Sequence, residues 1–159
     1  MSKSFSKIKI KETGVEIGFI SHVSVEEDVK NVHTEIKSQV KPHQSFFKAF
    51  QNLKRFAIGY MELSMFKTNI EPHILDQYVV TAINIYEDMD TVKVKISVNK
   101  ELSNKKMFSI TTPLIDLYDE DYVELSELES AYQDLLAEAE EYLEGKNGDT
   151  QIKIDFKAA

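Results

Sequence analysis

Histidine is the side chain best suited to metal binding and to proton transfer near neutral pH, and this chain has four. They are His22, His33, His43 and His73, and no two of them have the four-residue spacing that places both on one face of a helix. Cysteine is absent, which excludes disulfides and thiolate metal sites. We expect no metal and no cofactor. The alternative is a zinc site with histidine and carboxylate ligands from distant segments.

The glycine, serine and acidic motifs of common enzyme and calcium sites are also missing. The five glycines, at positions 14, 18, 59, 145 and 148, form neither a phosphate-binding loop nor a dinucleotide fingerprint. No nucleophile elbow supports a Ser–His–Asp arrangement. The acidic run 119–121 lacks the glycine and the distal glutamate of a calcium loop. We therefore expect no catalytic residues and a protein that is not an enzyme. An enzyme of unknown type is the least favoured alternative.

Two groups of lysines could form a basic surface. Lys7, Lys9 and Lys11 share one face of an alternating segment, and Lys93 and Lys95 share one face of another. If both faces adjoin in a sheet, they offer a positive surface to nucleic acid. The outward positions between these lysines are not aromatic, whereas sheets that bind single strands usually add stacking aromatic rings. Nucleic acid is therefore a disfavoured partner.

Acidic residues gather in the second part of the chain. Residues 68–159 carry 20 Asp and Glu against 8 Lys and Arg, while residues 1–67 carry 7 against 11. The charged outer face of an expected helix consists of Glu138, Glu140, Glu141 and Glu144. Such a face could mimic a phosphate backbone and occupy a basic groove on a partner protein. The alternative is that these carboxylates only solvate the helix.

Alternating apolar and polar residues predict the strands. The pattern occurs over residues 5–11, 15–19, 32–36 and 107–112, and in a short final segment, 152–157. The longest alternation covers residues 77–99, where two runs flank the acidic turn 87–90 and so predict a hairpin.

Apolar residues at three- and four-residue spacing predict two main helices, over residues 43–61 and 126–144. Ser126 and Glu129 have the spacing of a capping box, and Gly145 suits the C-terminal stop of the second helix. Because the strands cluster before and between the helices, we expect an α+β fold. Its sheet should be mostly antiparallel, with both helices packed on one face.

The bulk properties favour one domain over residues 1–159. The chain has 42% hydrophobic and 29% charged residues, which is ordinary for a globular protein. No apolar run approaches the ~20 residues of a membrane span, so we expect no membrane partner. Residues 1–11 lack the apolar block of a signal peptide, which predicts a cytoplasmic location. A homo-oligomer is compatible with all of these properties.

Three blocks of the sequence, in this order, resemble a family of small bacteriophage and prophage proteins encoded in early regions. The blocks are Pro42 to Leu53 with Glu62-Leu63, then Lys100 to Asn104 with Thr111-Thr112-Pro113, then Leu125-Ser126 with Glu138 to Lys146. The chain departs from the family pattern at Met61, where the family often has cysteine. It also has residues 114–118 in place of a longer segment rich in proline and serine.

The resemblance implies a phage-encoded protein, expressed among replication, recombination or host-takeover genes and acting in the host cytoplasm. It supplies no functional residues. The leading hypothesis is a non-enzymatic accessory binding protein that modulates a host or phage protein, including a role in counter-defence. The alternative is a nucleic-acid-binding accessory factor in phage recombination or replication, which would use the lysine faces.

Overall fold

The computed structural model describes residues 2–63, 70–88, 90–122 and 124–148. They form a seven-stranded sheet and four helices. The strands are β1 (Ser2–Lys11), β2 (Gly14–Val25), β3 (Asp28–Ser38), β4 (Tyr78–Glu87), β5 (Val92–Glu101), β6 (Met107–Thr111) and β7 (Ile115–Asp116). The helices are α1 (Gln44–Gln51), α2 (Lys54–Tyr60), α3 (Pro72–Leu75) and α4 (Leu125–Leu143).

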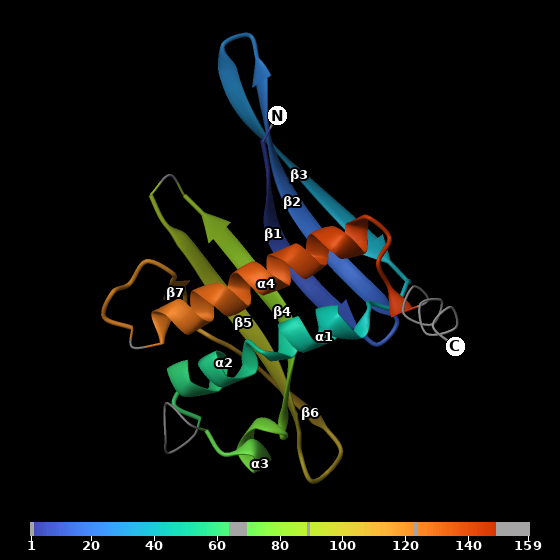
Figure 1. Ribbon diagram of the computed structural model, residues 1–159, viewed down its shortest axis with the longest axis vertical. Helices are drawn as coiled ribbons and strands as arrows, with labels where there is room; N and C mark the ends of the chain where they lie inside the picture. Colours follow the sequence, from blue (N-terminus) through green and yellow to red (C-terminus); the bar gives the residue numbers. More distant parts are fainter. Residues whose placement is uncertain (1, 64–69, 89, 123, 149–159) are drawn as a thin grey trace, which may run out of the picture.

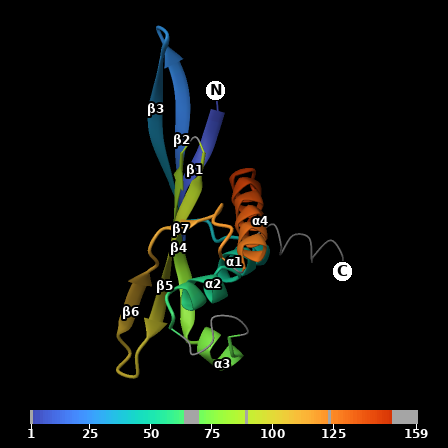
Figure 2. The same cartoon turned by 90° about the vertical axis from the view of Figure 1, so that its left-hand side faces the viewer.

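The sheet is antiparallel throughout its described pairs. Its strand order is β3-β2-β1-β4-β5-β6, and β7 adds a short pair to β5. All the helices lie on one face of this sheet, and the opposite face is open (Figure 2). The expected α+β fold, with helices on one face of a mostly antiparallel sheet, is therefore confirmed.

The hairpin of β2 and β3 projects beyond every other element (Figure 1). Val25 pairs with Asp28 at its tip, so the loop has two residues. Both of them, Glu26 and Glu27, have positive φ angles of 49° and 75°, as a two-residue turn of type I′ requires. The root of the hairpin is buried under the helices, but β3 is exposed from Asp28 to Lys37.

The helical layer begins with α1 and α2, which correspond to the helix expected over residues 43–61. The chain breaks that helix at Asn52, because the N–H of Leu53 binds Phe50 O, only three residues back, at 3.2 Å. The Gln51 side chain is bound to both backbone groups of Val80, at 2.9 and 3.0 Å. This contact fixes the last turn of α1 on β4, and α2 then packs on β5 as well.

Helix α4 crosses the sheet diagonally and lies beside α1 in the helical layer (Figure 1). The expected capping box is wrong: α4 begins at Leu125, no side chain caps it, and Ser126 Oγ donates to the neighbouring Glu127 instead. The expected stop is confirmed. Gly145 has a φ of +110°, and the N–H groups of residues 145 and 146 bind carbonyls of the last turn in a Schellman motif.

One apolar core fills the space between the sheet and the helices. Its largest fully buried side chains are Phe46, Phe50, Phe56, Ile8, Ile17, Leu53, Ile58, Ile83, Ile96, Ile115, Leu128 and Leu135. The alternation that predicted β1, β2, β4 and β5 therefore places the expected apolar residues toward the helices, whereas Met107 and Phe108 of β6 are exposed. Helix α3 and strand β7 were not predicted, and the expected final strand over 152–157 lies outside the described residues. Among the helices that the structure describes, none has the length and apolar character to cross a membrane.

Candidate functional site

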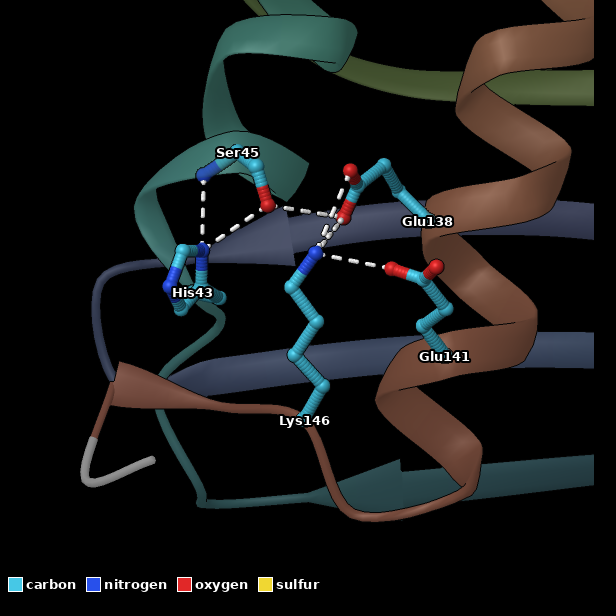
Figure 3. Close-up of polar contacts among 5 residues, drawn as sticks. All are labelled: His43, Ser45, Glu138, Glu141 and Lys146. Atoms are coloured by element: carbon cyan, nitrogen blue, oxygen red, sulfur yellow. Dashed lines mark hydrogen bonds and ion pairs between the residues drawn. The ribbon is translucent and has the colours of Figure 1, made fainter. Parts of the chain in front are cut away.

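The acidic outer face of α4 meets α1 at a polar cluster (Figure 3). Ser45 Oγ donates to Glu138 Oε2 at 2.9 Å and lies 2.8 Å from His43 Nδ1. Lys146 Nζ binds Glu138 Oε2 at 3.3 Å and Glu141 Oε2 at 2.7 Å. The hydrogen bonds that Lys146 donates, first to Glu141 and then to Glu138, raise the pKa of Lys146. The cluster ties the start of α1 to the last turns of α4.

The order of side chains in this cluster differs from a catalytic triad. In a triad the imidazole lies between the hydroxyl and the carboxylate, so that it can take the hydroxyl proton. Here the hydroxyl of Ser45 lies between the imidazole and the carboxylate. His43 Nδ1 also accepts the N–H of Ser45, at 3.1 Å, as the N-cap of α1. The geometry gives these residues a structural role.

The structure divides the four expected acidic residues into two pairs. Glu138 and Glu141 are both bound to Lys146, which compensates one of their two negative charges. Glu140 and Glu144 face the other side of α4 and are exposed. Neither of them forms an ion pair among the described residues, so both can offer their charge to a partner. Partner binding by the acidic face stays a prediction, and Glu140 and Glu144 are its uncompensated part.

Glu140 and Glu144 stand at the edge of an apolar groove. The groove has a volume of about 390 Å³ and is lined by Phe5, Phe19, Leu143 and the two carboxylates. Its floor is the ring pair of Phe5 and Phe19, whose centroids are 5.1 Å apart on adjacent strands. We call these five residues the acidic-rim groove. Local sequence patterns do not reveal this groove, because its residues come from β1, β2 and α4.

The projecting hairpin continues the floor of the acidic-rim groove. Residues two apart on a strand share a face, so Val23 and Val25 follow Phe19 on the side of the helices. Val32 of β3 lies opposite Ser21 on the same side. Val25 and Val32 are each 46% exposed. The groove therefore opens onto an apolar strip, which no described helix covers.

The lysines of the two expected basic faces do lie on one surface, the open face of the sheet. Asn84 of β4 pairs with Lys7 on one side and Lys95 on the other, which brings both lysine groups to the same face across one intervening strand. Lys95 Nζ lies 6.0 Å from the centroid of the Tyr86 ring. Tyr86 is an exposed aromatic residue on this face.

Glu16 on β2 compensates part of that basic surface. Its carboxylate forms an ion pair with Lys7 at 3.3 Å and another with Lys11, and Lys7 also lies 3.5 Å from Glu35. Two of the five expected lysines are therefore neutralised within the sheet. Glu16 was not among the expected site residues, although its place between two inward-facing apolar residues of β2 indicates that it lies on the outward face.

The ion pairs of Glu16 give a testable pH dependence. The hydrogen bond from Lys11, and then that from Lys7, lowers the pKa of Glu16 from 4.5 to about 2. Because the folded-state pKa is the lower one, this stabilisation is present above pH ~4.5 and is lost as the pH falls toward 2. We expect an NMR titration of the Glu16 carboxyl to have its midpoint near pH 2.

The same prediction can be checked by substitution. Glu16→Gln should be less stable than the wild type at neutral pH, and the difference should shrink as the pH falls from ~4.5 toward 2. Glu12→Gln removes an exposed carboxylate in the neighbouring turn and serves as the control. A Glu16 midpoint at the ordinary value would contradict the ion pairs.

A second groove, with a volume of about 630 Å³, lies between α2 and the start of α4. It is lined by both signs of charge, including Lys54, Arg55, Asp76 and Asp134. Partial burial lowers the pKa of Lys54, while Asp76 acts in the opposite direction. Arg55 is already bound to Glu124 at 3.1 Å and lies over the ring of Phe56. Because the lining carries both signs of charge, the groove favours neither an anionic nor a cationic ligand.

The expectation of a metal-free fold leads to another prediction. Within residues 2–63, 70–88, 90–122 and 124–148, no three His, Asp or Glu side chains are placed to hold a metal ion. We expect EDTA to leave the circular dichroism spectrum and the thermal midpoint unchanged. Loss of structure in EDTA that zinc reverses would contradict the prediction.

Comparison of the chain with models of known protein families, with curated proteins and with solved structures gives no significant match in any of the three.

Proposed function

We propose that this chain is a non-enzymatic binding protein that modulates a second protein by holding an apolar segment flanked by Lys or Arg. The observation that carries the proposal is the acidic-rim groove, with its two exposed carboxylates above an apolar floor. A partner side chain that fills the floor would bury apolar surface at roughly 25 cal/mol per Å². Lys or Arg beside it would meet Glu140 and Glu144, which steers association and fixes orientation.

The strip on the projecting hairpin extends the same contact. Val25 and Val32 are exposed valines that lie on the same face of the sheet as the groove, farther along the hairpin. An exposed apolar patch bordered by charge is typical of a protein interface. The resemblance to phage and prophage proteins favours a host or phage protein as the partner, in the host cytoplasm, with counter-defence as one role of the modulation.

The experiment compares three versions of the chain as bait in extracts of host cells. They are the wild type, Glu140→Lys with Glu144→Lys, and the control Glu120→Lys with Glu129→Lys. Both variants change the net charge equally, but Glu120 and Glu129 do not line the groove. We expect a partner that is retained by the wild type and the control and is lost from the groove variant. The amount of partner recovered should fall at least about 10-fold, which is equivalent to a loss of ~1.4 kcal/mol of binding free energy.

The captured protein must then bind the purified chain. Anisotropy titrations with a peptide of its apolar, basic segment should give the same order of affinities among the three versions. Equal affinity of the wild type and the groove variant would overturn the groove as the binding site. If no captured protein binds the purified wild type, the proposal itself fails.

A second candidate function, a nucleic-acid-binding accessory factor in recombination or replication, is favoured by the common face of the two lysine groups. Lys9, Lys93 and Lys95 lie on it outside every ion pair of the described chain, and Lys37 of β3 faces the same side. The acidic residues of α4 lie on the opposite side of the sheet, where they repel a polyanion less strongly.

For this candidate we expect weak binding. About four phosphate contacts would give a slope of log affinity against log salt of roughly −3 to −4 on duplex DNA. We therefore predict no binding tighter than micromolar to random single- or double-stranded DNA at roughly physiological salt. Nanomolar affinity in an anisotropy titration, lost in Lys93→Glu with Lys95→Glu, would make nucleic acid the leading partner.

A further inference from the structure

Strand β3 is the free edge of the sheet beside the projecting hairpin. It is the first strand in the order β3-β2-β1-β4-β5-β6, so in the described chain it pairs only with β2. Its eleven residues include Val29, Val32 and Ile36, with exposed fractions of 67%, 46% and 39%. A long edge strand with exposed apolar residues is a template for pairing with another strand.

The turn fixes which backbone groups are available at this edge. In a hairpin with a two-residue loop, the residues beside the loop exchange hydrogen bonds, so Asp28 faces Val25. Hydrogen-bonded and non-hydrogen-bonded residues then alternate along an antiparallel strand. The N–H and C=O groups of the odd-numbered residues, from Val29 to Lys37, therefore point away from β2.

Two copies of such an edge can pair antiparallel about a two-fold axis, and the odd-numbered residues must face each other. A two-fold axis at Thr34 satisfies this condition. It places Thr34 opposite Thr34 of the second copy, Val32 opposite Ile36, and His33 opposite Glu35. Asn31 then lies opposite Lys37. No two like charges face each other in this register.

Neighbouring registers are poorer. An axis at His33 places Lys30 opposite Ile36 and Val29 opposite Lys37. An axis at Val32 places Val29 opposite Glu35 and Asp28 opposite Ile36. Each of these pairings sets an apolar side chain against a charge, whereas the axis at Thr34 pairs Val32 with Ile36 on the side of the helices. Cross-strand pairs of two β-branched apolar residues stabilise a sheet.

We infer that the partner of the β3 edge is a second copy of this chain, paired antiparallel with the axis at Thr34. The two sheets become one continuous sheet with both helical layers on the same side. The tip of each hairpin reaches the other copy near Ser38, where Tyr142 of that copy's α4 donates to the Ser38 hydroxyl at 2.8 Å. The interface is isologous, as is usual for a dimer.

The absence of native cysteine allows a test of both the dimer and its register. Thr34→Cys places one thiol on the axis, where non-hydrogen-bonded residues have Cβ atoms about 4.5–5.5 Å apart. On oxidation we expect a disulfide-linked dimer as the main product. His33→Cys is the matched control, because its thiols would be diagonal neighbours about 7–8 Å apart and should cross-link at least tenfold more slowly.

Sedimentation of the chain without cysteine supplies the second measurement. The wild type should form dimers at about 100 µM, and Glu35→Ala should do so as well. Glu35→Pro removes an outward N–H and should be monomeric, while its circular dichroism spectrum stays folded, because proline is tolerated at an edge. A monomeric wild type without cross-linking at position 34 would overturn the dimer. Faster cross-linking at position 33 than at position 34 would overturn the register.

Discussion

Replacing Leu135 with alanine is expected to lower the free energy of unfolding by about 2–5 kcal/mol. Leu135 lies in the middle of α4, and its side chain is completely buried in the core. Truncation would remove its apolar contacts and leave a cavity that neighbouring backbone cannot fill, since α4 is held at its end by Lys146 and Ser45 through Glu138. Urea denaturation followed by circular dichroism measures the change.

Gln133→Ala is the control for this prediction. Gln133 lies on the exposed side of the same helix, so its replacement should change stability by no more than about 0.5 kcal/mol. An unchanged denaturation midpoint in Leu135→Ala would mean that this face of α4 does not pack into the core. A similar loss in both variants would show that the loss does not come from burial, because alanine has the highest helix propensity of all residues.

The strands could be predicted because one face of the sheet is covered and the other is open. Under those conditions burial alternates along a strand, as it does where Ile8 is buried between the half-exposed Lys7 and Lys9. The same argument predicted a strand near Val32 and Ile36, but not that both remain exposed. Both are exposed because β3 lies at the edge of the sheet, beyond the helical layer. The alternation of apolar and polar residues does not specify the order of strands in a sheet, so this position could not be predicted.

The break between α1 and α2 could not be predicted from periodicity. The apolar stripe from Phe46 to Ala57 continues through Asn52 without interruption, and all the stripe residues are buried. A tertiary contact lies beside the break: Gln51 Nε2 donates to Val80 O, and Gln51 Oε1 accepts the N–H of Val80. Such a contact joins residues 29 positions apart, which local spacing does not reveal.

The candidate site was predictable only in part, for the same reason. Glu140 and Glu144 were identified as acidic helix residues, but their separation from Glu138 depends on Lys146 folding back over one side of α4. Phe5 was outside any expected site. The acidic-rim groove exists because α4 crosses β1 and β2 at an angle that leaves the Phe5–Phe19 pair at its edge.

Replacing Phe50 with alanine is expected to have the largest effect of any single truncation proposed for this chain, about 3–5 kcal/mol of unfolding free energy. Phe50 is fully buried on α1, one turn after the buried Phe46 and directly before the break at Asn52. Phe50 belongs to the apolar core, and its helix packs on both β4 and α4. Denaturation in urea should show a lower midpoint with an unchanged slope, because the unfolded state exposes the same surface.

Phe47 on the same helix provides a matched control, since it is 44% exposed. Phe47→Ala makes the same chemical change on the outer side of α1 and should cost less than about 1 kcal/mol. The difference between the two variants therefore measures burial rather than helix propensity or residue type. Equal losses at both positions would contradict the orientation of α1, and with it the packing that holds α4 and its acidic rim beside the hairpin.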